Sequence, residues 1–185
     1  MAFALQARDD PAFGAGKNIG MGYNLKANEA TSRSDLRRAG VPDERIDDVL
    51  EGRASLMPEQ AQRLLMVAMP RYEKQVQEVA NAANPGLWDR MTAPQRAVMV
   101  DVAYQVGSTD KFKKAWAALA TGDSESFRNE TKVFYTNKAG ERVEDTRRGQ
   151  LRASMLSGIP HWEAMVQKYG SMPGSKLQAL AMSPK

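Results

Sequence analysis

Residues 16–28 read GKNIGMGYNLKAN, a short segment in which three glycines fall within seven positions. The apolar Ile19 and Met21 alternate with these glycines, a pattern typical of a strand that bends and lets a ligand approach its backbone. Gly14 and Gly16 permit a tight turn just before it. We therefore expect a small β-hairpin near the start of a chain that otherwise has the spacing of helices.

Most of the remaining sequence predicts helices. A long amphipathic helix begins at Pro58, and Pro70 should kink or restart it because proline removes a backbone donor. The segment from Thr92 to Tyr104 is apolar nearly all round, so we expect it to be the central buried helix. Residues 135–140 (YTNKAG) predict a polar excursion. Further helices are expected after Ser34, after Pro42 as far as Gly52, from Phe112 to Gly122, after Asp123, from about Asp145 to Gly158, and at residues 160–169.

This order of elements predicts an α+β fold that is mostly α. Residues 1–57 should form a small β-hairpin lobe, which the long helix joins to a helical bundle lobe at residues 58–169. A binding cleft is expected between the two lobes. Residues 170–185 (GSMPGSKLQALAMSPK after Tyr169) have the composition of a linker or disordered tail.

Composition excludes several classes of site. The 185 residues are 42% hydrophobic, which allows a sizeable core, and they include no cysteine, so disulfides and zinc–thiolate sites are excluded. The one histidine, His161, cannot build a His-rich metal centre, so we predict no metal and no cofactor. No signal peptide and no membrane span are predicted. A wall target would therefore require that another component delivers the chain.

The charge balance favours an anionic partner. There are 26 Lys and Arg against 22 Asp and Glu, which suits a cell wall, a nucleic acid or a membrane surface. The basic residues are interspersed with acidic ones, as in ERIDD and RYEKQVQE, so we predict no nucleic-acid partner. The glycine-rich segment is not a nucleotide fingerprint either, since no helix opens directly after it.

Polar residues flank the predicted hairpin. Asp9 and Asp10 precede the glycines, and Asn18 directly precedes Ile19, which places a carboxylate and an amide at neighbouring strand ends. One interpretation is a small hairpin with an aspartate in its turn. The other is a site that holds a water molecule beneath a ligand.

Four segments, in order, carry a resemblance to a known family. NIGMGYNL is similar to a T-I-G-x-G-H strand segment, and SLMPEQAQRLLMVAMPRYEKQV is similar to a long inter-lobe helix. QRAVMVDVAYQVG is similar to a central helix that ends in aromatic-Gln-x-Gly, and DTRRGQLRASMLSG is similar to a late region with two arginines. Across about residues 9–158 the chain resembles the tailed-phage lysozymes of the phage T4 type, glycoside hydrolase family 24.

The resemblance implies a lysozyme-like fold and a muramidase activity without a cofactor. Such enzymes hydrolyse the β-1,4 bond between N-acetylmuramic acid and N-acetylglucosamine in bacterial peptidoglycan. A Glu is the general acid, while an Asp and a Thr hold the attacking water, an arrangement that suits an inverting glycosidase. Carried over, the Asp role falls on Asp9 or Asp10, and the Thr role falls on Asn18.

Substrate-binding positions follow from the same motifs. Tyr23 stands where the family has a His, and Asn24 follows it on the predicted strand. Tyr104 and Gln105 match the end of the central helix, where the family's glutamine contacts substrate. Arg148 belongs to the late basic pair, for which both a structural role and a saccharide-facing role are open.

The chain departs from the family at the general acid. No Glu precedes Glu29, which follows the predicted strand in a loop and is a poor substitute. Leu5 and its neighbours do not replace the family's first helix. Either a preceding helix of a longer protein supplies the Glu, or the fold is kept and the activity is lost.

Two readings of function follow. The first is a bacteriolytic muramidase domain, either an endolysin released from the host cytoplasm by a holin or a virion-associated lysin, that acts at the periplasmic wall. The second is an inactive module that binds peptidoglycan or has a structural role among the domains and subunits of a phage virion.

Overall fold

The computed structural model describes residues 4–9, 16–137 and 139–159. Five strands lie in two antiparallel sheets, of order β1-β2-β3 and β4-β5. Their bounds are β1 Ala4–Asp9, β2 Lys17–Gly20, β3 Tyr23–Asn24, β4 Phe134–Thr136 and β5 Arg142–Glu144. The described helices are α1 Ser32–Arg38, α2 Asp43–Glu51, α3 Pro58–Ala83, α4 Leu87–Arg90, α5 Ala93–Val106, α6 Lys113–Thr121, α7 Ser124–Glu130 and α8 Thr146–Leu156. The prediction of a mostly helical α+β fold is confirmed.

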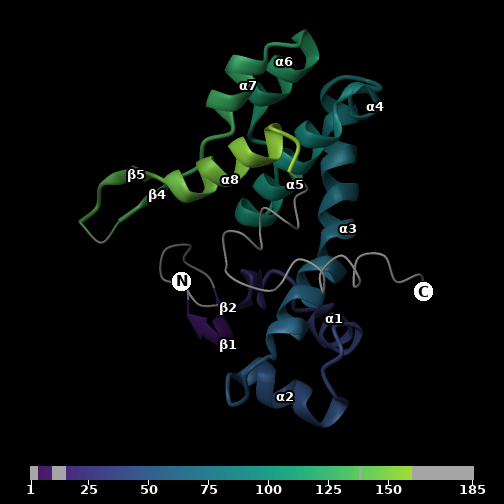
Figure 1. Cartoon of the computed structure of the whole chain (residues 1–185), viewed down its shortest axis with the longest axis vertical. Helices are drawn as coiled ribbons and strands as arrows, with labels where there is room; N and C mark the ends of the chain where they lie inside the picture. The colour runs from purple at the N-terminus through teal and green to yellow at the C-terminus, as the bar shows by residue number, and fades with distance from the viewer. Residues whose placement is uncertain (1–3, 10–15, 138, 160–185) are drawn as a thin grey trace.

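Two lobes are stacked along α3 (Figure 1). The first three strands, α1 and α2 lie at one end of this helix, and α4 to α8 with the β4–β5 hairpin lie at the other. A helix of 26 residues is about 39 Å long, enough to pass through both lobes. One hydrophobic cluster runs through both, from Ile19 in β2 to Met155 in α8.

Local sequence signals place most helix ends where they are observed. Gly52, Gly107 and Gly122 follow α2, α5 and α6 with positive φ angles, which residues other than glycine rarely adopt. The side chains of Asp123 and Asp145 accept hydrogen bonds from backbone N–H groups in the first turns of α7 and α8. These ends agree with the predicted ones.

Several local expectations were wrong. Helix α3 continues through Pro70 as one element, so of the expected kink or restart only the restart is wrong. Helix α1 begins at Ser32 rather than after Ser34, and the residue before it, Thr31, makes no side-chain cap. The expected polar excursion at residues 135–140 is largely the β4–β5 hairpin, in which Tyr135 pairs with Val143. The expected helix at 160–169 and the tail at 170–185 lie outside the described residues.

Packing follows the apolar pattern of α5. Val98, Met99, Val102 and Ala103 have no exposed surface or almost none, so this helix is the buried centre of its lobe, as expected. The same helix also buries Asp101 completely. A carboxylate at the centre of a core requires bound partners, which lie on α8.

Candidate functional site

Two carboxamides lie opposite each other on the paired strands β2 and β3. Asn18 has Asn24 as its partner in the register, and both are half-buried. The next pair, Ile19 and Tyr23, is buried in the core on the opposite face of the sheet. Asn24 also accepts a hydrogen bond of 2.8 Å from the backbone of Ala27, which holds its side chain in place. Both amides therefore lie on the face of the sheet opposite Ile19 and Tyr23, where the Asn18 Oδ1 atom is itself buried.

Glycines let this pair of strands lie close to the helices. Gly20 has φ +63°, and a Cβ placed on it would lie 3.4 Å from the Cβ of Ala61 in α3. Gly22 has φ +94°, and its Cβ would lie 3.8 Å from Tyr104 in α5. The turn between β2 and β3 therefore reaches the helical lobe, and it has the conformation that glycine adopts without strain.

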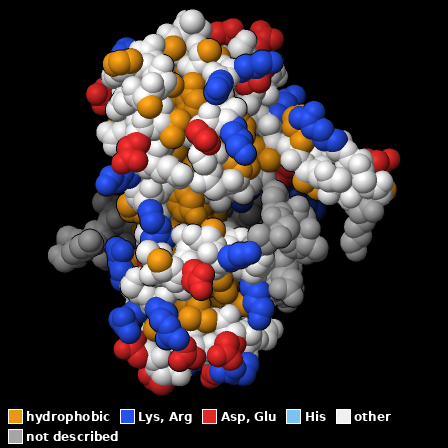
Figure 2. Space-filling view, turned by 180° about the vertical axis from the view of Figure 1, so that it is seen from behind, with side chains coloured by type: hydrophobic (Ala, Val, Ile, Leu, Met, Phe, Trp, Pro, Cys, Tyr) orange, Lys and Arg blue, Asp and Glu red, His pale blue; other side chains and the backbone are white. Residues whose placement is uncertain are grey.

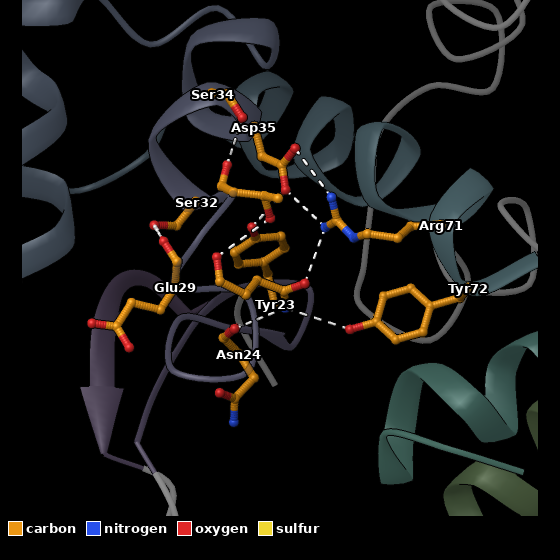
Figure 3. Close-up of polar contacts among 10 residues, drawn as sticks. Tyr23, Asn24, Glu29, Ser32, Ser34, Asp35, Arg71 and Tyr72 are labelled. Carbon is orange, nitrogen blue, oxygen red and sulfur yellow. Dashed lines mark hydrogen bonds and ion pairs between the residues drawn. The ribbon is translucent and has the colours of Figure 1, made fainter. Parts of the chain in front are cut away.

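A buried carboxylate organises the polar groups beneath the strands (Figure 3). Asp35 is 1% exposed and accepts a hydrogen bond of 2.7 Å from the Tyr23 hydroxyl. Arg71 of α3 binds the same carboxylate oxygen at 2.8 Å and reaches Asn28 Oδ1 at 3.0 Å. Asn28 in turn donates to the Tyr72 hydroxyl at 3.4 Å. We call these five residues the Asp35 network.

The Asp35 network fixes its own protonation states. Burial alone would raise the pKa of Asp35, but hydrogen bonds from Arg71 and Tyr23 hold it below its ordinary value. Burial, and then the hydrogen bond to Asp35, raises the pKa of Tyr23 above its ordinary range. Near neutral pH the network therefore contains an ionised carboxylate, a guanidinium and a neutral phenol.

The two lobes contact each other directly next to this network. The rings of Tyr72 in α3 and Tyr104 in α5 meet edge to face, with centroids 5.2 Å apart. Three residues further along α3, Gln75 donates a hydrogen bond of 3.0 Å to the backbone oxygen of Gly107. The junction of the lobes thus places aromatic and amide groups near the turn at Gly22.

A second ionic network joins α5 to α8. Asp101 pairs with both Arg148 and Arg152, and the Arg152 Nε–Asp101 Oδ2 distance is 2.9 Å. Gln105 accepts from Arg152 at 2.5 Å and donates to Asp145 at 3.1 Å. We call these residues the Asp101 network. Asp101, Arg148 and Arg152 are almost fully enclosed, with side-chain exposures of 0%, 7% and 4%, whereas the fourth charged residue, Asp145, is half-buried at the edge.

The predicted site residues therefore occupy different environments. The half-buried Asn18 and Asn24 lie together. The buried Tyr23 and Arg148 and the half-buried Gln105 bind groups of the protein itself. Their expected substrate contacts stay predictions, and for Arg148 the geometry supports the structural role.

The predicted acidic residues lie at the edge of the described structure. Asp9 is the last residue of β1 and lies opposite Lys17, next to Arg8, which is the register partner of Asn18. Asp10 lies outside the described residues. Glu29 is exposed in the loop before α1. This loop therefore offers no apolar enclosure of the kind that surrounds a general acid.

Sequence reasoning missed Asp35, Arg71, Asp101 and Arg152. The available signal was an acidic residue within an apolar helical run, MVDVAY, because such a residue must be paired if the helix is central. The partners of Asp101 lie 47 and 51 residues away, so local patterns could not identify them.

Within the described ranges, no three His, Cys, Asp or Glu side chains lie together in a way that could hold a metal ion. None of the helices described here has the length and apolarity needed to cross a membrane. Comparisons with protein-family models, with curated proteins and with solved structures gave no match.

Proposed function

We propose that this chain is a lysozyme-like domain that acts on bacterial peptidoglycan, a phage muramidase for the bond between N-acetylmuramic acid and N-acetylglucosamine. The observation that carries the proposal is the half-buried Asn18–Asn24 pair beside the end of β1. Carboxamides both donate and accept hydrogen bonds, which suits the hydroxyl and acetamido groups of a sugar chain.

The water-activating carboxylate is assigned to Asp9 or Asp10. Asp9 ends the strand that pairs with β2, and the residue before it, Arg8, is the register partner of Asn18. In an inverting glycosidase this carboxylate removes a proton from water, and the neighbouring amide orients the same water. Asn18 takes the orienting role in the proposal.

The general acid has to come from a segment outside the described residues. A general acid stays protonated because a dry site raises its pKa. The buried Asp35 is instead held in its ionised form, since its ion pair with Arg71 lowers its pKa. The carboxylate of Asp101 is paired with two arginines. Neither meets the requirement, and Glu29 is exposed.

An apolar pocket between α3 and α5 offers a place for such a segment. Its volume is 420 Å³, and Met66, Met69, Ala97 and Val100 are among its lining residues. Gln62 lies one turn before Met66 on the same helix face, and its buried amide has no hydrogen-bond partner among the described residues. An amphipathic helix that carries the acid would cover this surface and offer the amide a partner.

A non-catalytic, peptidoglycan-binding module is the second candidate function. The pairing of the buried carboxylates Asp35 and Asp101 with arginines favours it. In this case the Asn18–Asn24 pair binds the glycan, and no bond is cleaved.

Clearing of permeabilised Gram-negative cell walls by the purified chain tests both candidates. For a muramidase, walls clear and new muramic acid reducing ends appear, while Asp9→Ala/Asp10→Ala loses about 10²–10⁴-fold in rate because the water is no longer activated. The matched control Asp43→Ala/Asp47→Ala, which removes two exposed carboxylates of α2, keeps the activity.

The same samples distinguish the second candidate. A binding module leaves the turbidity unchanged but sediments with insoluble peptidoglycan, and Asn18→Ala sediments less. If the chain neither clears walls nor sediments with them, and both variants behave as the parent does, both functions are wrong.

A further inference from the structure

A second surface hollow lies on the helical lobe, outside the proposed glycan site. It is a groove of 640 Å³ bounded by the end of α5, the start of α6, the segment after α7 and the β4–β5 hairpin. Five cationic side chains line it against a single carboxylate, Glu130. These cations are Lys111, Lys113, Lys114, Lys132 and Arg142. We call this surface the basic groove.

The basic groove accounts for the whole positive balance of the chain. The sequence has 26 Lys and Arg and 22 Asp and Glu; five of the former and one of the latter line the groove, so 21 of each sign remain elsewhere. Figure 2 shows the two signs interspersed over one face of the molecule. The linear sequence hides this concentration because the five cations come from three separate segments.

Three of these cations have no ion pair within the described residues, and one of the three, Arg142, lies over the Phe134 ring instead. Lys114 lies 3.9 Å from Glu130, and Lys132 lies 3.7 Å from Glu144. Lys111 and Lys113 have no such pair among the described residues, and both are exposed. The groove therefore keeps positive charge that an anionic partner can neutralise.

The groove also has an apolar component. Val106 and Phe134 are 40% and 39% exposed, an unusual exposure for large hydrophobic residues in this chain. Phe112 and Val133 line the same surface. The guanidinium of Arg142 lies 4.1 Å from the centre of the Phe134 ring, so one face of this ring is already covered.

We propose that the basic groove binds an acidic segment of a partner protein in which an apolar side chain lies between carboxylates. Carboxylates neutralise Lys111 and Lys113, and the apolar side chain covers Val106 and Phe134. A phosphodiester polymer offers no side chain for these apolar atoms. A single-stranded nucleic acid would stack its bases on aromatic rings, and Arg142 leaves only one face of Phe134 for such stacking.

Fluorescence anisotropy of a labelled acidic decapeptide with two central leucines tests the proposal on the full chain. Binding should weaken as salt is added, because the Debye length shortens. Lys111→Gln/Lys113→Gln should weaken it by about fivefold, the effect of two exposed ion pairs. The control Lys26→Gln/Lys74→Gln removes two exposed charges outside the groove and should bind as the parent does.

The apolar half of the proposal has its own variant. Val106→Ser changes an exposed side chain, so the fold is retained, and it should weaken the leucine-containing peptide but not a serine-containing analogue. Equal binding of the two peptides by the parent chain overturns this half of the proposal.

Two competing ligands decide the class of partner. Tighter binding of an oligothymidylate or of inorganic polyphosphate than of the peptide overturns the assignment to a protein segment. If Lys111→Gln/Lys113→Gln instead lowers sedimentation with peptidoglycan and leaves peptide binding unchanged, the groove belongs to the glycan site and the proposal fails. Neither result depends on whether the chain is catalytic.

Discussion

Each lobe is built on one buried aspartate, but the two aspartates differ in what surrounds their partners. Asp35 of the small lobe binds Arg71, whose side chain is 38% exposed, and Tyr23, whose hydroxyl group donates to it. Asp101 of the helical lobe is enclosed with Arg148 and Arg152, both less than a tenth exposed. One network is open toward solvent at the junction of the lobes, and the other is closed.

The difference shows which carboxylate can respond to its surroundings. A fully buried ion pair adds little to the free energy of unfolding, because both charges lose their hydration. Removing one partner lowers the free energy of unfolding strongly, because the other charge stays buried without a partner. In an ion pair that is open to solvent, water can replace part of the lost hydrogen bonding. Breaking it therefore lowers the free energy of unfolding less, and titration of its carboxylate changes stability with pH. We therefore expect the Asp101 network to set stability and the Asp35 network to set pH dependence.

The largest expected effect is at Asp101. Asp101→Asn removes the carboxylate that the two buried guanidinium groups share, and only Asp145 remains near Arg152. The variant should lower the free energy of unfolding by about 3–5 kcal/mol, measured by urea denaturation. The triple variant with Arg148→Met and Arg152→Leu should recover part of this loss. The control is Asp43→Asn, which breaks an exposed ion pair. A smaller loss of unfolding free energy for Asp101→Asn than for this control would show that the Asp101 network is not shielded from solvent.

A smaller effect, with a pH signature, is expected at Arg71. Arg71→Met should cost about 2 kcal/mol at neutral pH, since Tyr23 and entering water still bind the buried carboxylate. In the parent chain the pKa of Asp35 is lowered in the folded state, so its contribution is present above about pH 4 and is lost as the pH falls through the folded-state pKa.

Arg71→Met should change how the free energy of unfolding depends on pH in the acidic range. Without Arg71 the pKa of Asp35 rises, because burial remains and the largest favourable interaction is gone, so less stability is lost on acidification. Urea unfolding curves recorded between neutral and acidic pH measure this loss of stability. Arg37→Met, which breaks an exposed pair with Asp43, should keep the parent profile. Identical profiles for parent and Arg71→Met would refute the open network.

The smallest expected effect distinguishes two similar helix caps. Asp145 caps α8 and also accepts from Gln105 at the edge of the Asp101 network, whereas Asp123 only caps α7. Asp145→Ala should lower the free energy of unfolding by about 1–2 kcal/mol, and Asp123→Ala should lower it less. Equal losses would mean that the hydrogen bond to Gln105 contributes nothing.

What could be predicted from the sequence was the local part of the fold. Helix ends at Gly52, Gly107 and Gly122 and caps at Asp123 and Asp145 depend on residues within one turn, so their signals are local. The β4–β5 hairpin was missed because its strands are only three residues long and its loop is polar.

The candidate site divides in the same way. Asn18 and its glycines are recognisable as a segment, but the Asp35 pair joins residues 36 apart and depends on how α1 packs on α3. The basic groove was also missed, since its cations are scattered along the sequence and only folding gathers them.

The position of α3 has a consequence for the order in which the lobes can form during synthesis. The small lobe needs residues up to Arg71 to complete its ion pair, whereas the helical lobe needs α8 up to Arg152. At roughly 5–20 residues per second, the ribosome adds the intervening segment in on the order of ten seconds. During this interval the first lobe can fold. Asp101 is also synthesised during it, before Arg148 and Arg152, so its carboxylate does not yet have its two partners.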